Sequence, residues 1–143
     1  MAVMRCLIGL AVAAAINAVP AAAQRPGDAI AGLWMNPYNS VAVRAGDCGP
    51  KLCGWVAWAN AEAKSDAREE GVDPLIGVAL LQDYQPSNAK NWSGTIFVPD
   101  LGRHFSSTIT LLDRDRLKVK GCLIGGFICK SQVWRRIEHL PDA

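Results

Sequence analysis

The side chains with the clearest potential for chemistry in this sequence are its cysteines, which can oxidise in pairs to disulfides or bind zinc as thiolates. Of the five cysteines, Cys6 belongs to an apolar N-terminal segment, which leaves Cys48, Cys53, Cys122 and Cys129. Three pairings of these four are open, and the local pairs Cys48–Cys53 and Cys122–Cys129 are favoured because each pair flanks a turn. Facing positions of a hairpin bring two Cα atoms to about 4.5–5.5 Å, which suits a disulfide. The two turns are Gly49-Pro50-Lys51-Leu52 and a segment that contains Gly125-Gly126.

Zinc binding and catalysis are the competing uses of such residues. The C-x4-C and C-x6-C spacings are wider than those of a usual zinc knuckle, so disulfides are favoured over a metal site. Only two histidines are present, His104 and His139, and neither has a serine-nucleophile elbow or a zinc-binding partner nearby in the sequence. We therefore predict no metal, no cofactor and no catalytic residue. A hydrolase remains the weakest hypothesis, and it requires His104 to meet carboxylates in a pocket.

Tryptophans are the candidates for ligand contact, because an exposed indole can stack on a sugar, a peptide or an apolar molecule. Trp34 and Trp134 are most simply core residues of a β-structure. Trp55 and Trp58 lie three residues apart in one β-favouring run, so strand alternation predicts that they point to opposite faces. We predict Trp34, Trp55 and Trp58 as ligand-binding residues, with packing beneath a long loop as the alternative.

A charged stripe offers a second candidate surface. Arg116, Lys118 and Lys120 alternate along one run, and this pattern fits either a site for an anionic ligand or, as we favour, a solvated strand face. Asp113 and Asp115 are better explained by turn chemistry than by cation binding. The formal net charge of +2 is too small for general attraction to nucleic acid, which we therefore exclude as a partner.

The elements that must position these residues are short β-favouring runs broken by turn residues, the pattern of a sandwich or barrel. Alternation is clearest in the second half of the chain, where Phe105, Ser107, Ile109 and Leu111 share one strand face. Residues Asn60–Gly71 are polar without an apolar stripe, so we predict a surface loop with at most one helical turn. The sequence predicts an all-β fold, an antiparallel barrel of about eight strands. The runs are Ala31–Met35, Val41–Ala45, Leu52–Ala59, Gly77–Tyr84, Trp92–Val98, Phe105–Leu111, Arg116–Lys120 and Ser131–Ile137, with a turn over Gln85–Asn91.

The N-terminus predicts export. Met1–Arg5 supplies a basic start, the residues up to Val19 are almost all apolar, and Ala21-Ala22-Ala23 fits the pattern that signal peptidase accepts. We predict a cleaved signal peptide over residues 1–23, an arm over 24–31, one barrel domain over 32–138 and a tail over 139–143. Such a protein is periplasmic or secreted and has no membrane span after cleavage. An oxidising compartment also explains an even number of paired cysteines.

Several short motifs stand in a fixed order along the chain. They are Gly32-Leu-Trp34, Cys48-Gly-Pro-Lys-Leu-Cys53-Gly54, Trp92-Ser-Gly94 followed by Pro99 and Gly102, Leu117-Lys-Val-Lys-Gly121-Cys122, and Ser131-Gln-Val-Trp134-Arg-Arg136. In this order they resemble the bacterial family catalogued as domain of unknown function 2147 (DUF2147), over about Gly32 to Ile137. The resemblance implies an exported protein of Gram-negative bacteria and brings no activity with it. The sequence departs from the common pattern at Arg103, Phe105 and Arg135.

A looser likeness links the chain to lipocalins, the calycin-like barrels in which a G-x-W on the first strand packs near an arginine on the last. Gly32-Leu-Trp34 with Arg135 or Arg136 matches that arrangement, in which a guanidinium stacked on an indole closes one end of the barrel. An eight-stranded barrel has room inside for side chains or one small ligand. We therefore expect a protein that binds a small apolar or amphipathic molecule of the cell envelope.

The alternative is a solid barrel that acts on another envelope protein, as an interaction or inhibitor module. Its contact surface would be the loop Asn60–Gly71 together with the turn clamped by Cys48 and Cys53. Whether the barrel interior is open separates the two hypotheses, because a filled interior favours the interaction module.

Overall fold

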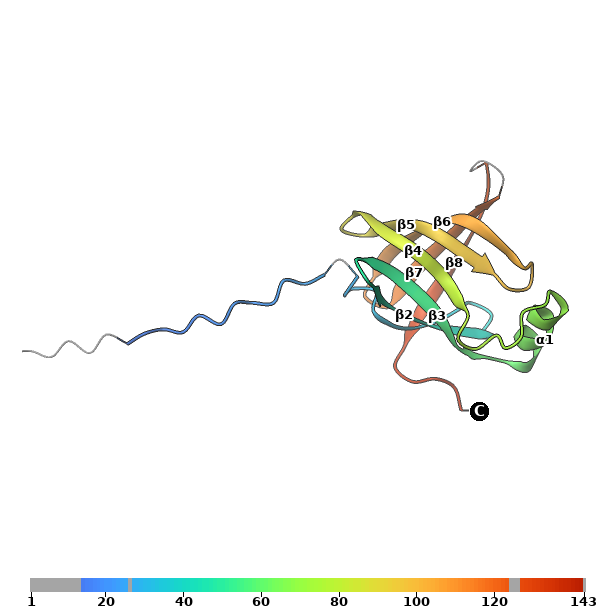
Figure 1. Ribbon diagram of the computed structural model, residues 1–143, viewed down its shortest axis with the longest axis horizontal. Helices are drawn as coiled ribbons and strands as arrows, with labels where there is room; N and C mark the ends of the chain where they lie inside the picture. Colours follow the sequence, from blue (N-terminus) through green and yellow to red (C-terminus); the bar gives the residue numbers. More distant parts are fainter. Residues whose placement is uncertain (1–13, 26, 124–126, 143) are drawn as a thin grey trace, which may run out of the picture.

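The computed structural model describes residues 14–25, 27–123 and 127–142 of the chain, whose path is drawn in Figure 1. Over these residues the chain forms eight strands and one helix. The elements are β1 (Gly32–Met35), β2 (Val41–Cys48), β3 (Lys51–Ala59), α1 (Ala61–Glu69), β4 (Ala79–Asn88), β5 (Asn91–Val98), β6 (Arg103–Asp113), β7 (Arg116–Leu123) and β8 (Ile128–Ile137).

The strands form a closed antiparallel barrel in sequence order, which confirms the predicted fold class. Each strand pairs with the next along the chain, and β8 returns to pair with β1 through Trp34 opposite Arg136. Closure gives every strand two hydrogen-bonded neighbours, so the barrel has no open sheet edge. Helix α1 lies at one end of the barrel, and the N-terminal segment enters the barrel at the opposite end (Figure 1).

The predicted inward faces of the second half are confirmed. Trp92 on β5, Ile109 on β6 and Leu117 on β7 are all buried in one apolar cluster inside the barrel. The intervening residues of β6 and β7 face outward, where Lys120 is exposed. The alternation of apolar and polar residues along these strands therefore determines which side chains face the barrel interior.

A β-bulge overturns the expectation for the two tryptophans of β3. Val43 pairs with Val56, whereas Ala42 pairs with Trp58, so β3 contains one extra residue between these pairs. The bulge shifts the alternation by one position and puts Trp58 on the same face as Trp55. Since Val43 belongs to the interior cluster, that shared face is the outer one.

Helix α1 is longer than the single turn predicted for Asn60–Gly71. The Asn60 side chain caps it, since Oδ1 accepts a hydrogen bond from the Ala63 backbone N–H at 2.8 Å. Ala67 is the one buried residue of the helix, and Ala63 packs partly buried against the core, while the other residues of the helix are exposed. A nine-residue helix with one buried residue has no apolar stripe for sequence periodicity to detect.

Asn60→Ala is expected to destabilise α1 by about 1 kcal/mol, because the cap is lost and an N–H of the first turn is left without its partner. Hydrogen exchange of the α1 amides should speed up several-fold while exchange of the barrel strands stays unchanged. Asn60→Asp, which keeps the capping oxygen, is the matched control. Equal protection in Asn60→Ala and Asn60→Asp would contradict a capping role.

Several strand boundaries also differ from the sequence prediction, and those of β4 and β8 change the shape of the barrel ends. β4 continues to Asn88, through Pro86, where a turn was predicted over Gln85–Asn91. Its pairing with β5 is irregular there, with register shifts on both sides of the Pro86–Trp92 pair, so proline is accommodated without a regular ladder. β8 begins at Ile128 and so projects beyond the barrel wall together with the end of β7 (Figure 1).

Both predicted local disulfides are present. Cys122 and Cys129 are direct register partners on β7 and β8, with their Cα atoms 4.0 Å apart. Cys48 and Cys53 are bonded with Cα atoms 5.7 Å apart, but they lie diagonally, since Cys48 pairs with Lys51. Each disulfide therefore clamps one hairpin end.

Some predictions fall on residues outside the described part. They concern Gly125-Gly126 in the second turn and positions 1–13 of the predicted signal peptide; positions 14–23 have no regular secondary structure. Among the described residues, no helix is long and apolar enough to cross a membrane.

Candidate ligand-binding cavity

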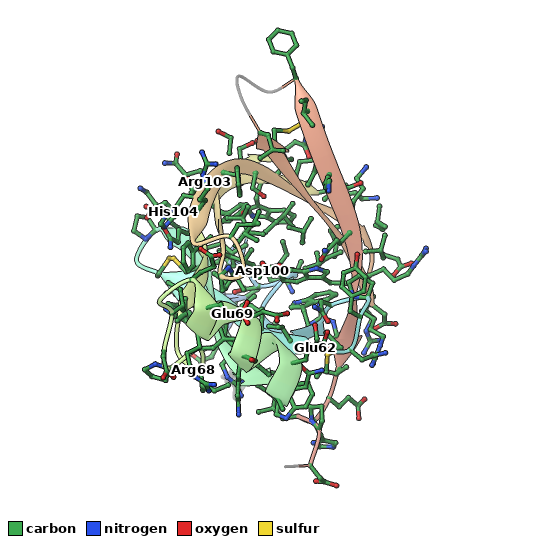
Figure 2. All side chains as sticks on the ribbon, turned by 90° about the vertical axis from the view of Figure 1, so that its right-hand side faces the viewer. Glu62, Arg68, Glu69, Asp100, Arg103 and His104 are labelled. Atoms are coloured by element: carbon green, nitrogen blue, oxygen red, sulfur yellow. A yellow bond between two sulfur atoms is a disulfide. The ribbon has the colours of Figure 1, made fainter. Side chains whose placement is uncertain are left out.

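The barrel opens at the α1 end into a cavity of about 610 Å³. Its wall combines the inward row of β8, the β5–β6 turn, α1 and the β1–β2 turn. Figure 2 looks toward this end and shows Asp100 and Glu62 around the opening. The volume lies in the range of about 300–1,000 Å³ that is typical of small-molecule sites.

The inner wall of the cavity is apolar. Leu80, Ile96, Phe105, Val119 and Trp134 line it, and Val119 and Trp134 continue into the buried cluster below. Burying a hydrocarbon against such a wall contributes roughly 25 cal/mol for each Å² removed from water. The cavity therefore lies between the α1 end and the buried cluster.

A glycine on β7 keeps the cavity open. Gly121 lines the wall, and a Cβ atom added to it would lie 3.4 Å from Ile96 Cγ2 with no other contact within 4 Å. A side chain at this position would therefore extend into the cavity rather than into packed atoms. This makes Gly121 a position at which the cavity can be filled without disturbing the fold.

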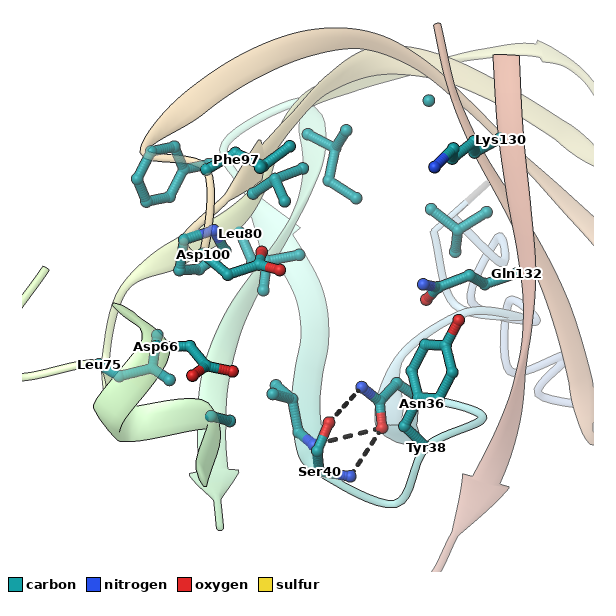
Figure 3. Close-up of a pocket in the computed structure, with 18 of the residues that line it drawn as sticks. Asn36, Tyr38, Ser40, Asp66, Leu75, Leu80, Phe97, Asp100, Lys130 and Gln132 are labelled. Atoms are coloured by element: carbon teal, nitrogen blue, oxygen red, sulfur yellow. Dashed lines mark hydrogen bonds between the residues drawn. The ribbon is translucent and has the colours of Figure 1, made fainter. Parts of the chain in front are cut away.

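The rim beside β1 is rigid and polar. Asn36 Oδ1 accepts hydrogen bonds from the backbone N–H groups of Ser40 and Val41, and its Nδ2 donates to Ser40 Oγ at 2.8 Å (Figure 3). These bonds fix the β1–β2 turn, from which the exposed ring of Tyr38 projects at the cavity opening.

Three buried polar atoms of the barrel have no hydrogen-bond partner among the described residues. They are Tyr84 Oη, Trp92 Nε1 and Ser107 Oγ. Burial raises the pKa of the Tyr84 phenol above its ordinary value of 10.0, and the nearby Ser107 hydroxyl opposes that shift only in part. A phenol in this position stays neutral in the folded protein at pH values that ionise it in the unfolded chain.

Alkaline pH is expected to destabilise the protein through Tyr84. Below about pH 10 the phenol is protonated in both states; above it the unfolded chain loses a proton that the folded protein keeps, so stability falls as pH rises. In Tyr84→Phe the decrease in unfolding free energy between about pH 8 and pH 11, measured with urea, should be smaller. Tyr38→Phe, which alters an exposed ring, should keep the full decrease. Equal profiles for all three proteins would contradict the role of Tyr84.

The opposite end of the barrel is closed by Trp34 and Arg136. The guanidinium carbon of Arg136 lies 4.2 Å from the Trp34 ring centroid, and Trp34 Nε1 donates to the Ile30 carbonyl at 2.8 Å. Arg136 Nη1 donates to Ala31 O. Gly32 is required beneath it: its φ is +128°, and a Cβ there would lie 2.9 Å from Nη1.

The same guanidinium reaches two further main-chain carbonyls. Nη2 donates to Ala29 O and Nε to Arg114 O, both at 2.8 Å. Arg136 thus ties the turn over 27–30 and the β6–β7 turn to the last strand. Of the two arginines that the sequence offered for this role, Arg135 points elsewhere and donates to Asn39 Oδ1.

None of the three tryptophans predicted as ligand-binding residues lines the cavity. Trp34 is fully buried at the closed end, and Trp55 and Trp58 lie on the outer face of β3. Contact between these residues and a ligand stays a prediction. Trp134, which the sequence placed in the core, is the tryptophan that lines the cavity wall.

The other sequence candidates also lie outside the cavity. His104 is exposed on the outer face of β6, with its ring 4.7 Å from that of Phe97 (Figure 2). The hydrolase hypothesis needed this residue inside a pocket. Arg116 of the basic stripe pairs with Asp113 at 2.7 Å. Among the described residues, no group of three or more metal-ligating side chains is gathered.

Sequence reasoning missed several polar residues of the cavity, among them Lys130, Gln132, Asp66 and Asp100. The first two could have been found, because they share the strand face of Trp134 by alternation. The carboxylates could not, since their positions depend on α1 and on how the β5–β6 turn folds over the barrel end.

A closed eight-stranded antiparallel barrel with a cavity at one end and a tryptophan–arginine pair at the other is a lipocalin-like fold. Residues 32–136 match the family described as "Uncharacterized protein conserved in bacteria (DUF2147)", and the chain belongs to that family. Among solved structures, the fold is similar to that of protein HP1028 from Helicobacter pylori, described as a member of the lipocalin family. The TM-score is 0.56 at 12% identity, over 76% of this chain and 82% of that one. No curated protein matches the sequence.

Proposed function

We propose that this protein binds a small amphipathic molecule in the cavity at the α1 end of the barrel. The observation that carries the proposal is the cavity of about 610 Å³, with an apolar inner wall and polar groups at its opening. Such a wall takes up a hydrocarbon portion, and the opening leaves a polar portion in contact with side chains and water. The open interior favours this function over the interaction module, which a filled interior would favour.

A fluorescence titration with N-phenyl-1-naphthylamine, an apolar probe, tests the proposal. We expect saturable binding of one probe per chain and displacement by amphipaths with a hydrocarbon chain. Gly121→Leu, which places a side chain in the cavity, should weaken binding at least about ten-fold, equivalent to 1.4 kcal/mol. The free energy of unfolding of Gly121→Leu should not fall, because glycine within a strand is less favourable than a residue with a side chain.

Gly46→Leu is the matched control. Gly46 lies on β2, and a Cβ added there has no atom within 4 Å. This variant should bind the probe as the parent protein does. Absence of saturable binding, or equal affinity in Gly121→Leu and the parent, would overturn the proposal.

We also propose that the protein works outside the cytoplasm. The predicted signal peptide over residues 1–23 and the two disulfides support this compartment. N-terminal sequencing of the protein from a periplasmic fraction should give Gln24 as the first residue. Recovery of the protein from the cytoplasm with Met1 intact would contradict export.

A further inference from the structure

One wall of the cavity opening presents hydrogen-bond donors. Lys130 and Gln132 lie on the inward row of β8, above Trp134. Trp134 Nε1 donates to Gln132 Oε1 at 3.0 Å, which uses the acceptor of that amide and leaves its Nε2 donors available. The ammonium of Lys130 and the amide N–H groups of Gln132 can therefore both donate hydrogen bonds to a ligand group in the cavity.

The opposite wall presents carboxylates. Asp66 comes from α1 and Asp100 from the β5–β6 turn, and Figure 3 shows both side chains directed into the cavity, across from Lys130 and Gln132. Glu62, one turn before Asp66 on the helix, also lines this wall. The two walls carry opposite charge on either side of one opening.

These charges form no ion pairs among the described residues. The ion pairs among the described residues involve other side chains, and none includes Lys130, Asp66 or Asp100. All three side chains are exposed at the opening. A molecule that carries both charges would complement both walls at once.

We propose that the ligand is a zwitterionic amphipath with one hydrocarbon chain. Its phosphate or carboxylate lies at Lys130 and Gln132, its ammonium lies between Asp66 and Asp100, and its chain occupies the apolar inner wall. This inference rests on the proposed function and adds the chemistry of the head group. A purely anionic head would face the carboxylates, and a purely cationic head would face Lys130, so each is disfavoured by one wall.

Calorimetric titration with twelve-carbon amphipaths below their micelle concentrations tests the proposal. The probes are lauroyl lysophosphatidylethanolamine as the zwitterion, lauroyl lysophosphatidylglycerol as the anion, dodecylamine as the cation and monolauroylglycerol as the neutral compound. We expect the zwitterion to bind at least about ten-fold more tightly than each of the others. Glycerophosphoethanolamine, the same head without a chain, should not bind measurably.

Variants assign the two walls separately. Lys130→Met should weaken binding of the zwitterion and the anion but not of the amine. Asp66→Asn combined with Asp100→Asn should reduce the penalty on the anion, so that the difference in affinity between the anion and the zwitterion becomes smaller. Lys90→Met, in the β4–β5 turn away from the cavity opening, is the charge-matched control and should change nothing.

The outcomes separate this inference from the proposed function. If the neutral amphipath binds as tightly as the zwitterion, or if Lys130→Met weakens all four probes equally, the head-group assignment is wrong while the cavity still binds amphipaths. If the chainless head group binds as tightly as the amphipath, the hydrocarbon chain plays no part and the ligand is not an amphipath. If no probe binds, the proposed function fails as well.

Discussion

Arg136→Ala is expected to lower the free energy of unfolding by about 3 kcal/mol and the Tm by about 10 °C. The variant removes three charge-assisted hydrogen bonds to main-chain carbonyls, each 2.8 Å long, and the stacking on Trp34. It also leaves the carbonyls that received those bonds without their donor. The cost is large because one side chain joins three segments that are distant in the sequence.

The charge of Arg136 persists despite its position. Burial lowers the pKa of the guanidinium from its ordinary value of 12.5, while Asp115 acts in the opposite direction. A group that begins so far above neutral pH remains protonated, so its hydrogen bonds keep their ionic character. Arg136→Lys should therefore recover only part of the loss, because an ammonium cannot reach the same carbonyls in the fixed geometry of a guanidinium.

Arg135→Ala is the matched control on the same strand. The Arg135 side chain is exposed and donates one hydrogen bond among the described residues, to Asn39 Oδ1, so its removal should cost less than about 1 kcal/mol. Urea unfolding of the two variants measures the difference. Equal decreases in the free energy of unfolding for Arg135→Ala and Arg136→Ala would contradict the role of Arg136 in closing the barrel end. Probe binding per folded molecule should be unchanged in both variants, since the cavity lies at the other end.

Alternation along the strands made the barrel predictable, but features that depend on strand pairing escaped it. The faces of β6 and β7 follow from local periodicity, which a single run of sequence contains in full. The bulge in β3 does not, because it exists only relative to β2, and it moved Trp58 to the outer face. Helix α1 escaped for another reason: its stability comes from the Asn60 cap and the burial of Ala67, without an apolar stripe.

The choice between Arg135 and Arg136 could have been made from the sequence. Trp134 was placed in the core, and residues two apart on a strand share a face, so Arg136 is the arginine that faces inward. The cavity is different, because its volume is what remains after side chains from all eight strands have been placed. A lysine on an inward row, such as Lys130, is compatible with a strand end or with a ligand site, and only the hollow beside it separates the two.

Gly94→Ala is expected to destabilise the protein by about 3 kcal/mol, whereas Gly121→Ala should stabilise it by about 0.5 kcal/mol. Both glycines face inward in one row, because Gly94 on β5 pairs with Ser107 on β6, which pairs with Gly121 on β7. A Cβ at Gly94 would lie 2.7 Å from the carbonyl oxygen of Gln82 and 2.7 Å from Tyr84 Cγ. Neither the backbone nor a fully buried ring can move aside.

The contrast between these two positions explains how one row of small residues produces both a packed core and a cavity. At Gly94 the space is occupied by the ring of Tyr84, which enters from β4. At Gly121 only Cγ2 of Ile96 would come within 4 Å of a Cβ atom, at 3.4 Å, and the space becomes part of the cavity wall. Urea unfolding of Gly94→Ala and Gly121→Ala measures this difference directly. If the two variants have similar stabilities, the space beside Gly94 and the space beside Gly121 are packed alike. The absence of a side chain at Gly121 would then not explain the cavity.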